Sequence, residues 1–332
     1  MDTLKIGYLS KYYESKHIPM NCMLELTYSC NFACRHCYVQ DGGKTEMMSL
    51  ETAKYVIDQL KEVGVLKLTI TGGEPTLHHQ LPEIIEYARR NNMVTSLFTN
   101  ASRINDELLN IMSQAGTDVS VSLYGSNPII YKKITGSASN GIAVFSNIQY
   151  LLSRHIPVVL KTIATRDTFE DLPSIFKYAE SLGLPLAIET LLRPTLGNDS
   201  LNDLKLTTEE MSHVFQQFIP KSEPRNSNSS WCGAGTRVIC ISPAGELYPC
   251  ANFRYSLGNI HHGSIKEFLA SSELLKQVQD NSFNYKAACH QCEAKSFCLA
   301  CPGLWYTIQK SLSNPWPYNC EISKLRLHAS IS

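Results

Sequence analysis

The chain has 332 residues, of which 43% are hydrophobic and 18% are charged, and its 30 basic and 30 acidic residues give a formal net charge of zero. This composition indicates a globular protein of one large or two medium domains. The balanced charge argues against nucleic-acid binding. No apolar run approaches ~18 residues and the N-terminus has no secretory signal, so we expect no membrane partner and a cytoplasmic location.

The first two thirds of the chain alternate predicted strands and helices. Apolar residues at helical spacing, Ser and Asn caps and Gly stops predict helices at 49–64, 81–92, 105–116, 141–155, 172–183 and 207–219. Short β-prone runs between them predict strands at 22–29, 66–72, 93–100, 118–125, 157–165 and 185–192. Six such βα units predict a parallel sheet whose strand-end loops gather on one face. Six units are too few for the usual eight-fold barrel closure.

The twelve cysteines form two groups, with none between Cys37 and Cys232. The first group is Cys22, Cys30, Cys34 and Cys37, and the second is Cys232, Cys240, Cys250, Cys289, Cys292, Cys298, Cys301 and Cys320. Without a secretory signal the compartment should be reducing, which favours metal binding or catalysis over disulfides. The polar segment 221–230, rich in Ser, reads as a linker between a cysteine-free scaffold and a cysteine-dense tail.

Three of the early cysteines share one loop after the first predicted strand, with the spacing Cys30-x3-Cys34-x2-Cys37. A cubane iron–sulfur cluster normally takes four cysteines, so three would leave one iron open to a substrate or cofactor. The alternative is a structural metal site that borrows Cys22. Because Cys22 lies at the far end of that strand, over ~20 Å away, the catalytic interpretation is favoured.

Polar side chains follow or end the other five predicted strands. They are the run Thr71-Gly72-Gly73-Glu74-Pro75, Thr99 and Asn100, Ser120, Ser122 and Tyr124, Lys161, Thr165 and Arg166, and Glu189 and Arg193. Turn chemistry alone could explain the two glycines. It does not explain why a carboxylate follows them directly, one strand away from the cysteine loop.

The cysteine loop, together with Gly72-Gly73-Glu74-Pro75, resembles the radical S-adenosylmethionine (SAM) enzymes. The resemblance implies a partial (β/α)6 TIM-type barrel over 20–220, preceded by an N-terminal extension (1–19). It implies that the three thiolates hold a [4Fe–4S] cluster whose fourth iron is chelated by SAM, and that the glycine-rich motif contacts the methionine moiety. Reduction of SAM would yield a 5′-deoxyadenosyl radical that abstracts hydrogen from the substrate.

Further SAM contacts are expected by strand position only, at Asn100, Ser120, Ser122 and Arg166. Each of these could equally be an ordinary polar residue at a strand end. The chain departs from the family at His36, where an aromatic residue often precedes the third cysteine.

The C-terminal part has a predicted β-hairpin over 237–250 and a predicted helix over 264–279. Considered alone, its Cys-x2-Cys pairs suit zinc and iron–sulfur clusters equally well. Beside the N-terminal motif it resembles the SPASM domain, here over 231–325, with a C-terminal tail at 326–332. One gap departs from the SPASM pattern, with two residues instead of three between Cys298 and Cys301.

The SPASM resemblance implies two auxiliary [4Fe–4S] clusters. One would be bound by Cys289, Cys292, Cys298 and Cys320. The other would be bound by Cys232, Cys250 and Cys301, with Cys240 as a fourth ligand or, alternatively, as a free thiol that donates hydrogen. Cys22 is left as an ordinary buried strand cysteine.

SPASM enzymes mostly act on peptides or proteins, so the resemblance implies maturation of a ribosomally made peptide through a crosslink, thioether or other oxidation. Expected partners are the peptide, a reductant such as flavodoxin or ferredoxin, and a separate leader-peptide-binding protein, because only about twenty residues precede the first strand. Cofactor biosynthesis of a small-molecule or haem type is the alternative. Sulfatase maturation is disfavoured because Ala251, not an acidic residue, follows Cys250. A non-catalytic zinc or iron–sulfur module is the alternative of a different class.

Overall fold

The computed structural model describes residues 8–9, 11–13, 15–39, 46–136, 141–193, 201–224, 232–280, 289, 291–299 and 301–331. Parts of the predicted N-terminal extension (1–7, 10 and 14) and of the predicted linker (225–230) lie outside these residues. Among the described residues, no helix has the length and hydropathy that a membrane span requires.

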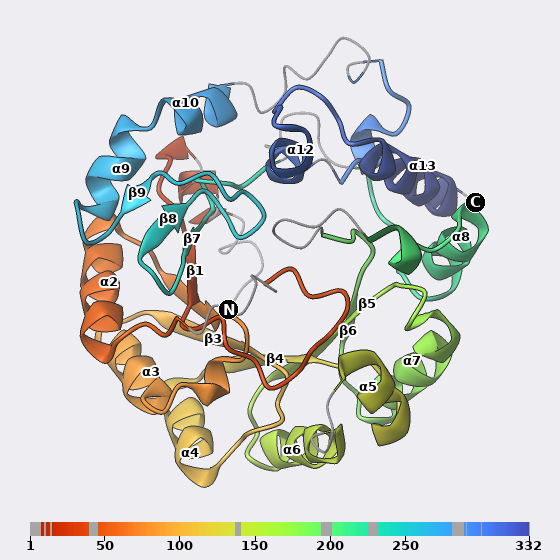
Figure 1. Ribbon diagram of the computed structural model, residues 1–332, viewed down its shortest axis with the longest axis horizontal. Helices are drawn as coiled ribbons and strands as arrows, with labels where there is room; N and C mark the ends of the chain where they lie inside the picture. Colours follow the sequence, from red (N-terminus) through yellow and green to blue (C-terminus); the bar gives the residue numbers. More distant parts are fainter. Residues whose placement is uncertain are drawn as a thin grey trace.

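Six parallel strands form the barrel part of the sheet in sequence order, which confirms the predicted α/β class. They are β1 (Asn21–Glu25), β2 (Lys67–Thr71), β3 (Val94–Thr99), β4 (Asp118–Ser122), β5 (Val158–Ile163) and β6 (Leu186–Glu189). Each pairs with its neighbour in parallel register, for example Leu24 with Ile70 and Leu160 with Leu186. Figure 1 shows these strands inside a ring of helices.

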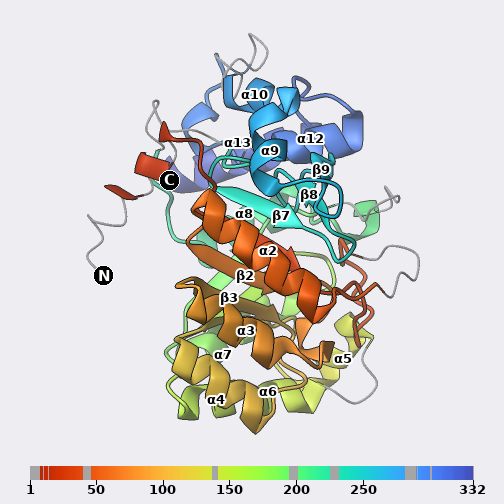
Figure 2. The same cartoon turned by 90° about the vertical axis from the view of Figure 1, so that its left-hand side faces the viewer.

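The helices that follow the strands cover the outer face of the sheet (Figures 1 and 2). They are α2 (Leu50–Val63), α3 (Leu81–Arg90), α4 (Asp106–Ala115), α6 (Gly141–Ser153), α7 (Leu172–Ser181) and α8 (Thr208–Gln217). The predicted caps are present: the Ser49 side chain accepts from Thr52 N–H, and Gly64 ends α2 in the left-handed conformation. Between the first and last described strands of the barrel, one α-helix was not predicted, α5 (Pro128–Thr135), which Asn127 caps at its N-terminus.

The two faces of the sheet differ in polarity. Residues that alternate toward the helices, such as Leu24, Leu68 and Val121, are fully buried in the main hydrophobic core. The intervening residues face the inside of the barrel, and many are polar or charged, among them Glu25, Lys67, Thr69, Ser96, Asp118, Ser120, Lys161 and Glu189. A barrel interior that served only as a core would be filled by branched apolar side chains, so this inner face is suited to binding.

The C-terminal part extends the same sheet. Strand β7 (Val238–Ile241) pairs in parallel with β1, then in antiparallel fashion with β8 (Glu246–Tyr248), and β8 pairs with β9 (Gly258–Asn259). The β7–β8 pair confirms the predicted hairpin, whose turn uses Gly245 at φ +83°. The pairing of β7 with β1 was not predicted, and it joins the two parts of the chain into one nine-stranded sheet.

The helices of this part differ from the prediction in two places. The predicted helix 264–279 is two helices, α9 (Ile265–Ser271) and α10 (Glu273–Asp280), because Ser272 is extended and its hydroxyl accepts from Leu275 N–H. After α12 (Pro302–Gln309), helix α13 (Pro317–Ile331) runs past residue 325, so residues 326–331 of the predicted tail are helical. Its Tyr318 and Ile322 share a hydrophobic cluster with Met211 of α8.

Candidate active site

The loop that carries Cys30, Cys34 and Cys37 leaves the end of β1 and lies against the glycine pair that follows β2. Gly73 N–H donates to Thr27 O at 2.7 Å, and Glu74 N–H donates to Ser29 O at 2.9 Å. A Cβ on Gly72 would lie 2.3 Å from Thr27 O, and one on Gly73 would lie 2.4 Å from Ser29 O. Glycine is required here because the two backbones approach this closely.

Glu74 does not present its carboxylate to a ligand. The side chain is fully buried, and Oε1 accepts from Thr76 N–H (3.0 Å), Thr76 Oγ1 (2.6 Å) and Thr99 Oγ1 (2.6 Å). Its Oε2 accepts from Asn100 N–H at 2.7 Å. Burial raises the pKa of Glu74, and these four donors oppose the shift. The carboxylate therefore fixes the end of β3 to the glycine motif, and in this way positions Asn100.

Asn100 meets the cysteine loop directly. Its Nδ2 donates to Asn31 Oδ1 at 3.0 Å and lies 4.0 Å from Cys30 Sγ, and Asn31 Nδ2 in turn donates to Ser102 Oγ at 2.8 Å. On the other side of the loop, Ala33 N–H donates to Thr135 O at the end of α5. The unpredicted helix α5 thus helps to hold the loop.

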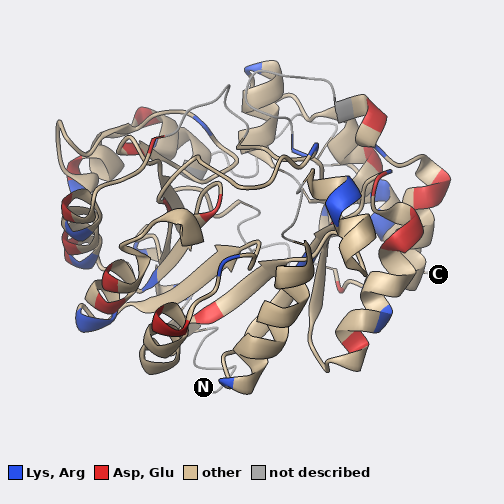
Figure 3. Ribbon diagram, turned by 60° about the horizontal axis from the view of Figure 1, so that its bottom comes forward, with Lys and Arg blue, Asp and Glu red and all other residues tan. Residues whose placement is uncertain are grey.

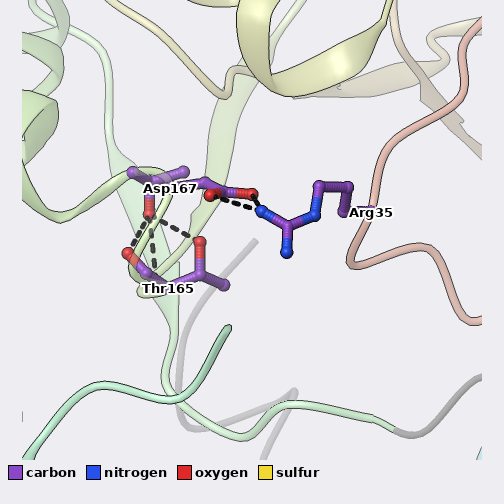
Figure 4. Close-up of polar contacts among 4 residues, drawn as sticks. Arg35, Thr165 and Asp167 are labelled. Atoms are coloured by element: carbon purple, nitrogen blue, oxygen red, sulfur yellow. Dashed lines mark hydrogen bonds and ion pairs between the residues drawn. The ribbon is translucent and has the colours of Figure 1, made fainter. Parts of the chain in front are cut away.

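An ion pair ties the middle of the cysteine loop to the loop after β5 (Figure 4). Arg35 Nη1 donates to both carboxylate oxygens of Asp167, at 2.9 and 3.1 Å. The turn that presents Asp167 is held by Thr168, whose hydroxyl donates to Ile163 O and accepts from Thr165 N–H. Sequence reasoning did not single out this pair, since the only signal was an arginine between two cysteines.

The three thiols suit an iron–sulfur cluster. Burial raises the pKa of Cys30 to about 11 and raises that of Cys34 further, and neighbouring thiols of the trio add to both shifts. Thiolates in this position would therefore need a cation beside them, which a cluster's irons would supply. Within the described ranges no three His, Cys, Asp or Glu side chains are placed to chelate one ion. A cubane, however, takes each thiolate on a different iron, so its ligands do not converge on one point.

The other predicted SAM contacts lie in different places. Ser120 and Ser122 are on the inner face of β4, opposite residues of β5. The backbone oxygen of Ser122 accepts from Tyr131 Oη at 2.7 Å. Arg166 is directed away from the cysteine loop, because its Nη2 donates to Lys205 O and lies 3.8 Å from Glu210. Of these candidates, Asn100 is the one that hydrogen-bonds to the cysteine loop within the described part of the chain.

His36 is buried in the same loop. Its ring lies edge-on to Tyr124, with centroids 4.4 Å apart, and neither ring nitrogen has a hydrogen-bond partner among the described residues. Burial lowers its pKa to about 4. The imidazole is therefore neutral near pH 7 and packs as an aromatic ring would, which accounts for its tolerance at a position that is often aromatic in the family.

The cysteines of the C-terminal part fall into two electrostatic groups. Burial raises the pKa of Cys250, and the neighbouring Cys301 and Cys232 raise it further. Burial likewise raises the pKa of Cys320, and there the neighbours that add to the shift are Cys298, Cys289 and Cys292. Apart from Cys240, these groups have the same members as the two ligand sets that the resemblance implies.

Cys240 lies apart, on the inner face of β7 opposite Met23. It is fully buried, and its Sγ is 3.9 Å from Arg254 Nη1. That guanidinium binds Glu25 with both terminal nitrogens, at 2.5 and 2.9 Å, and the side chains are 9% and 0% exposed. Sequence reasoning missed this buried pair, although an acidic residue at the end of an otherwise apolar strand was a signal for Glu25.

Comparisons with known proteins agree with this arrangement. The model of the radical SAM superfamily matches residues 24–179, and that of an iron–sulfur cluster-binding domain named SPASM matches residues 232–293. The mycofactocin maturase MftC of Mycolicibacterium smegmatis is 28% identical, over 85% of this chain and 78% of its own. The subtilosin biosynthesis protein AlbA of Bacillus subtilis is 25% identical, over 86% and 67%.

A further relative and a solved structure are also similar to this chain. The AdoMet-dependent heme synthase of Methanosarcina barkeri is 23% identical, over 89% of this chain and 94% of its own. The solved structure of anSMEcpe with bound AdoMet and Kp18Cys peptide superposes with a TM-score of 0.77 at 16% identity, over 94% and 97%. The chain therefore belongs to the radical SAM superfamily and carries a SPASM domain, which makes it an enzyme that uses a [4Fe–4S] cluster, S-adenosylmethionine and auxiliary iron–sulfur clusters.

Proposed function

We propose that this enzyme abstracts hydrogen from a peptide and thereby matures a ribosomally made precursor. The observation that carries the proposal is the placement of three thiols against the Gly72-Gly73 motif, at the end of a barrel whose inner face is polar. Two relatives, MftC and AlbA, are named for the production of a mycofactocin and a bacteriocin, and the superposed anSMEcpe structure holds a peptide. Each of these names supports a peptide substrate.

For the metal sites, we propose that Cys30, Cys34 and Cys37 hold the cluster that works with SAM. Cys289, Cys292, Cys298 and Cys320 would hold one auxiliary cluster, and Cys232, Cys250 and Cys301 the other. When bound, the cluster and SAM supply reductive cleavage of the sulfonium and a radical that takes a hydrogen atom. The chain's own contribution is to fix the thiols, through the glycine pair, Glu74 and Asn100.

For Cys240 two roles stay open, a fourth ligand of the second auxiliary cluster or a hydrogen donor. The influence of Cys250 on its pKa supports the first, and its place on the inner face of the sheet supports the second. Iron content decides between them: Cys240→Ala lowers it if the thiol is a ligand, and leaves it unchanged while turnover is lost if the thiol is a donor.

A second candidate function is cofactor biosynthesis of the haem type, which the heme synthase relative favours. Sulfatase maturation is not favoured, since Ala251 follows Cys250. As partners we propose a reductant such as flavodoxin or ferredoxin and a separate leader-peptide-binding protein.

The test is anaerobic reconstitution, reduction with dithionite and measurement of 5′-deoxyadenosine by mass spectrometry. The substrate in this assay is the deuterated product of a short peptide gene that neighbours the gene of this enzyme. We expect deuterium in the 5′-deoxyadenosine and a mass loss in the peptide. Cys34→Ala should abolish the product, whereas Cys22→Ala, the matched control in the barrel core, should keep it. Product without deuterium from the peptide, but with deuterium from a labelled porphyrin, would favour the second function.

A further inference from the structure

The six barrel strands contain only five charged residues, and four of them are neutralised by a partner. The five are Glu25, Lys67, Asp118, Lys161 and Glu189. The partnered groups form the pairs Lys67–Asp118 at 3.3 Å, Arg193–Glu189 at 3.5 Å and Arg254–Glu25 at 2.5 Å. Every carboxylate on these strands is therefore paired with a basic side chain. Lys161 is the charged residue of the six strands without an ion pair in the described part of the chain.

Lys161 faces the inside of the barrel. It lies on β5 opposite Ser122 and Ala187, and its neighbours Leu160 and Thr162 turn to the helix side. Its Nζ sits 3.4 Å from the centroid of the Phe98 ring on β3. Throughout the described part of the chain, no oxygen is within hydrogen-bond or ion-pair distance of this ammonium. Figure 3 shows many of the charged residues on the outer helices.

An ammonium has three donors, and an aromatic face satisfies its charge only in part. A half-buried ammonium without an oxygen acceptor therefore attracts an anion that enters the barrel. The position is two residues before the end of β5, about 7 Å deeper than the strand-end loops. An anion bound at this position lies inside the barrel, on the same inner face as Ser120 and Ser122.

We propose that Lys161, with Phe98 behind it, binds a carboxylate of the substrate peptide, either its C-terminus or an acidic side chain. This inference rests on the proposed peptide substrate and deepens it. The ring of Phe98 contacts the ammonium from one side. The carboxylate on the inner face of β4, that of Asp118, is already paired with Lys67. The arrangement selects peptides that bring a negative charge of their own.

The test is competitive selection on reconstituted, unreduced holoenzyme in the presence of SAM, so that no turnover is needed. The probes are three mixtures of N-acetylated pentapeptides: C-terminal amides without acidic residues, the same sequences with a free C-terminus, and amides with one Glu. Retained peptides are counted by mass spectrometry for wild type, Lys161→Gln, Lys161→Arg and the control Lys177→Gln, which removes an exposed ammonium on α7. SAM affinity is measured in parallel.

We expect wild type to enrich one carboxylate mixture at least tenfold over the amides, and the mixture enriched tells whether the C-terminus or a side chain is bound. Lys161→Gln should lose this enrichment, while Lys161→Arg and Lys177→Gln should keep most of it. Equal retention of all mixtures by wild type would overturn the proposal. So would a loss of SAM affinity in Lys161→Gln with peptide preference unchanged, because the carboxylate would then be that of SAM. Failure of the proposed function would appear separately, as absence of 5′-deoxyadenosine from reduced wild type.

Discussion

Replacing Gly73 by Ala tests whether the glycine pair builds the cysteine loop. The new Cβ would lie 2.4 Å from Ser29 O and 2.6 Å from Tyr28 O. Both are backbone oxygens, so no change of side-chain rotamer can relieve the overlap. Relieving this overlap moves the two backbones apart by almost 1 Å, which breaks the bonds from Gly73 N–H to Thr27 O and from Glu74 N–H to Ser29 O. Two backbone hydrogen bonds left unmade at these partly buried positions cost up to about 6 kcal/mol.

The matched control is Gly116→Ala. Gly116 also lies outside the strands, but a Cβ there meets nothing within 4 Å, and only its φ of +65° penalises alanine. That penalty is about 1–2 kcal/mol. The measurements are urea unfolding of the metal-free proteins, followed by circular dichroism, and iron content after anaerobic reconstitution.

We expect the free energy of unfolding to fall more in Gly73→Ala than in Gly116→Ala. Gly73→Ala should also lose the iron of one cluster, while Gly116→Ala keeps its iron. Equal unfolding midpoints for the two variants, with full iron in both, would refute the reasoning. In that case the loop would be held by Asn100 and α5 alone.

Three more predictions concern charged side chains. Arg254→Met leaves the carboxylate of Glu25 buried without its cation, which should lower the free energy of unfolding by about 3–5 kcal/mol; a loss below 1 kcal/mol in urea unfolding would contradict this. Arg35→Ala removes a half-exposed ion pair with Asp167, so the free energy of unfolding should change by less than about 1 kcal/mol. Loss of the cluster on dilution should be faster than in wild type. Identical rates of cluster loss would count against a role of this pair in holding the loop. Burial lowers the pKa of Lys161 to about 8. Retention of carboxylate peptides should therefore be constant well below pH 8 and fall as pH rises through the pKa and the ammonium loses its proton. A flat profile from pH 6 to 9.5 would contradict the assignment. The charged groups that face this ammonium are Arg193 and Lys67, which lower its pKa further, and Asp118 and Glu189, which oppose them.

The sequence by itself determined the order of the barrel strands and the cysteine loop. These features are local: apolar periodicity, caps at Ser49 and Asn105, and the spacing from Cys30 to Cys37 each lie within a few residues. The grouping of the C-terminal cysteines into two ligand sets came from the resemblance, which carries a long-range pattern that spacing alone does not, and it stays a prediction.

Only the tertiary structure decided what lies between elements that are far apart in the chain. The pairing of β7 with β1 joins residues more than 200 positions apart, and it buries Glu25 against Arg254. The role of Glu74 depends on its bonds to Thr99 and Asn100. That Lys161 lacks an acidic partner can be recognised only when the ion pairs of the other charged strand residues are known. Contacts of this kind depend on where strands meet in space, which no local pattern in the sequence encodes.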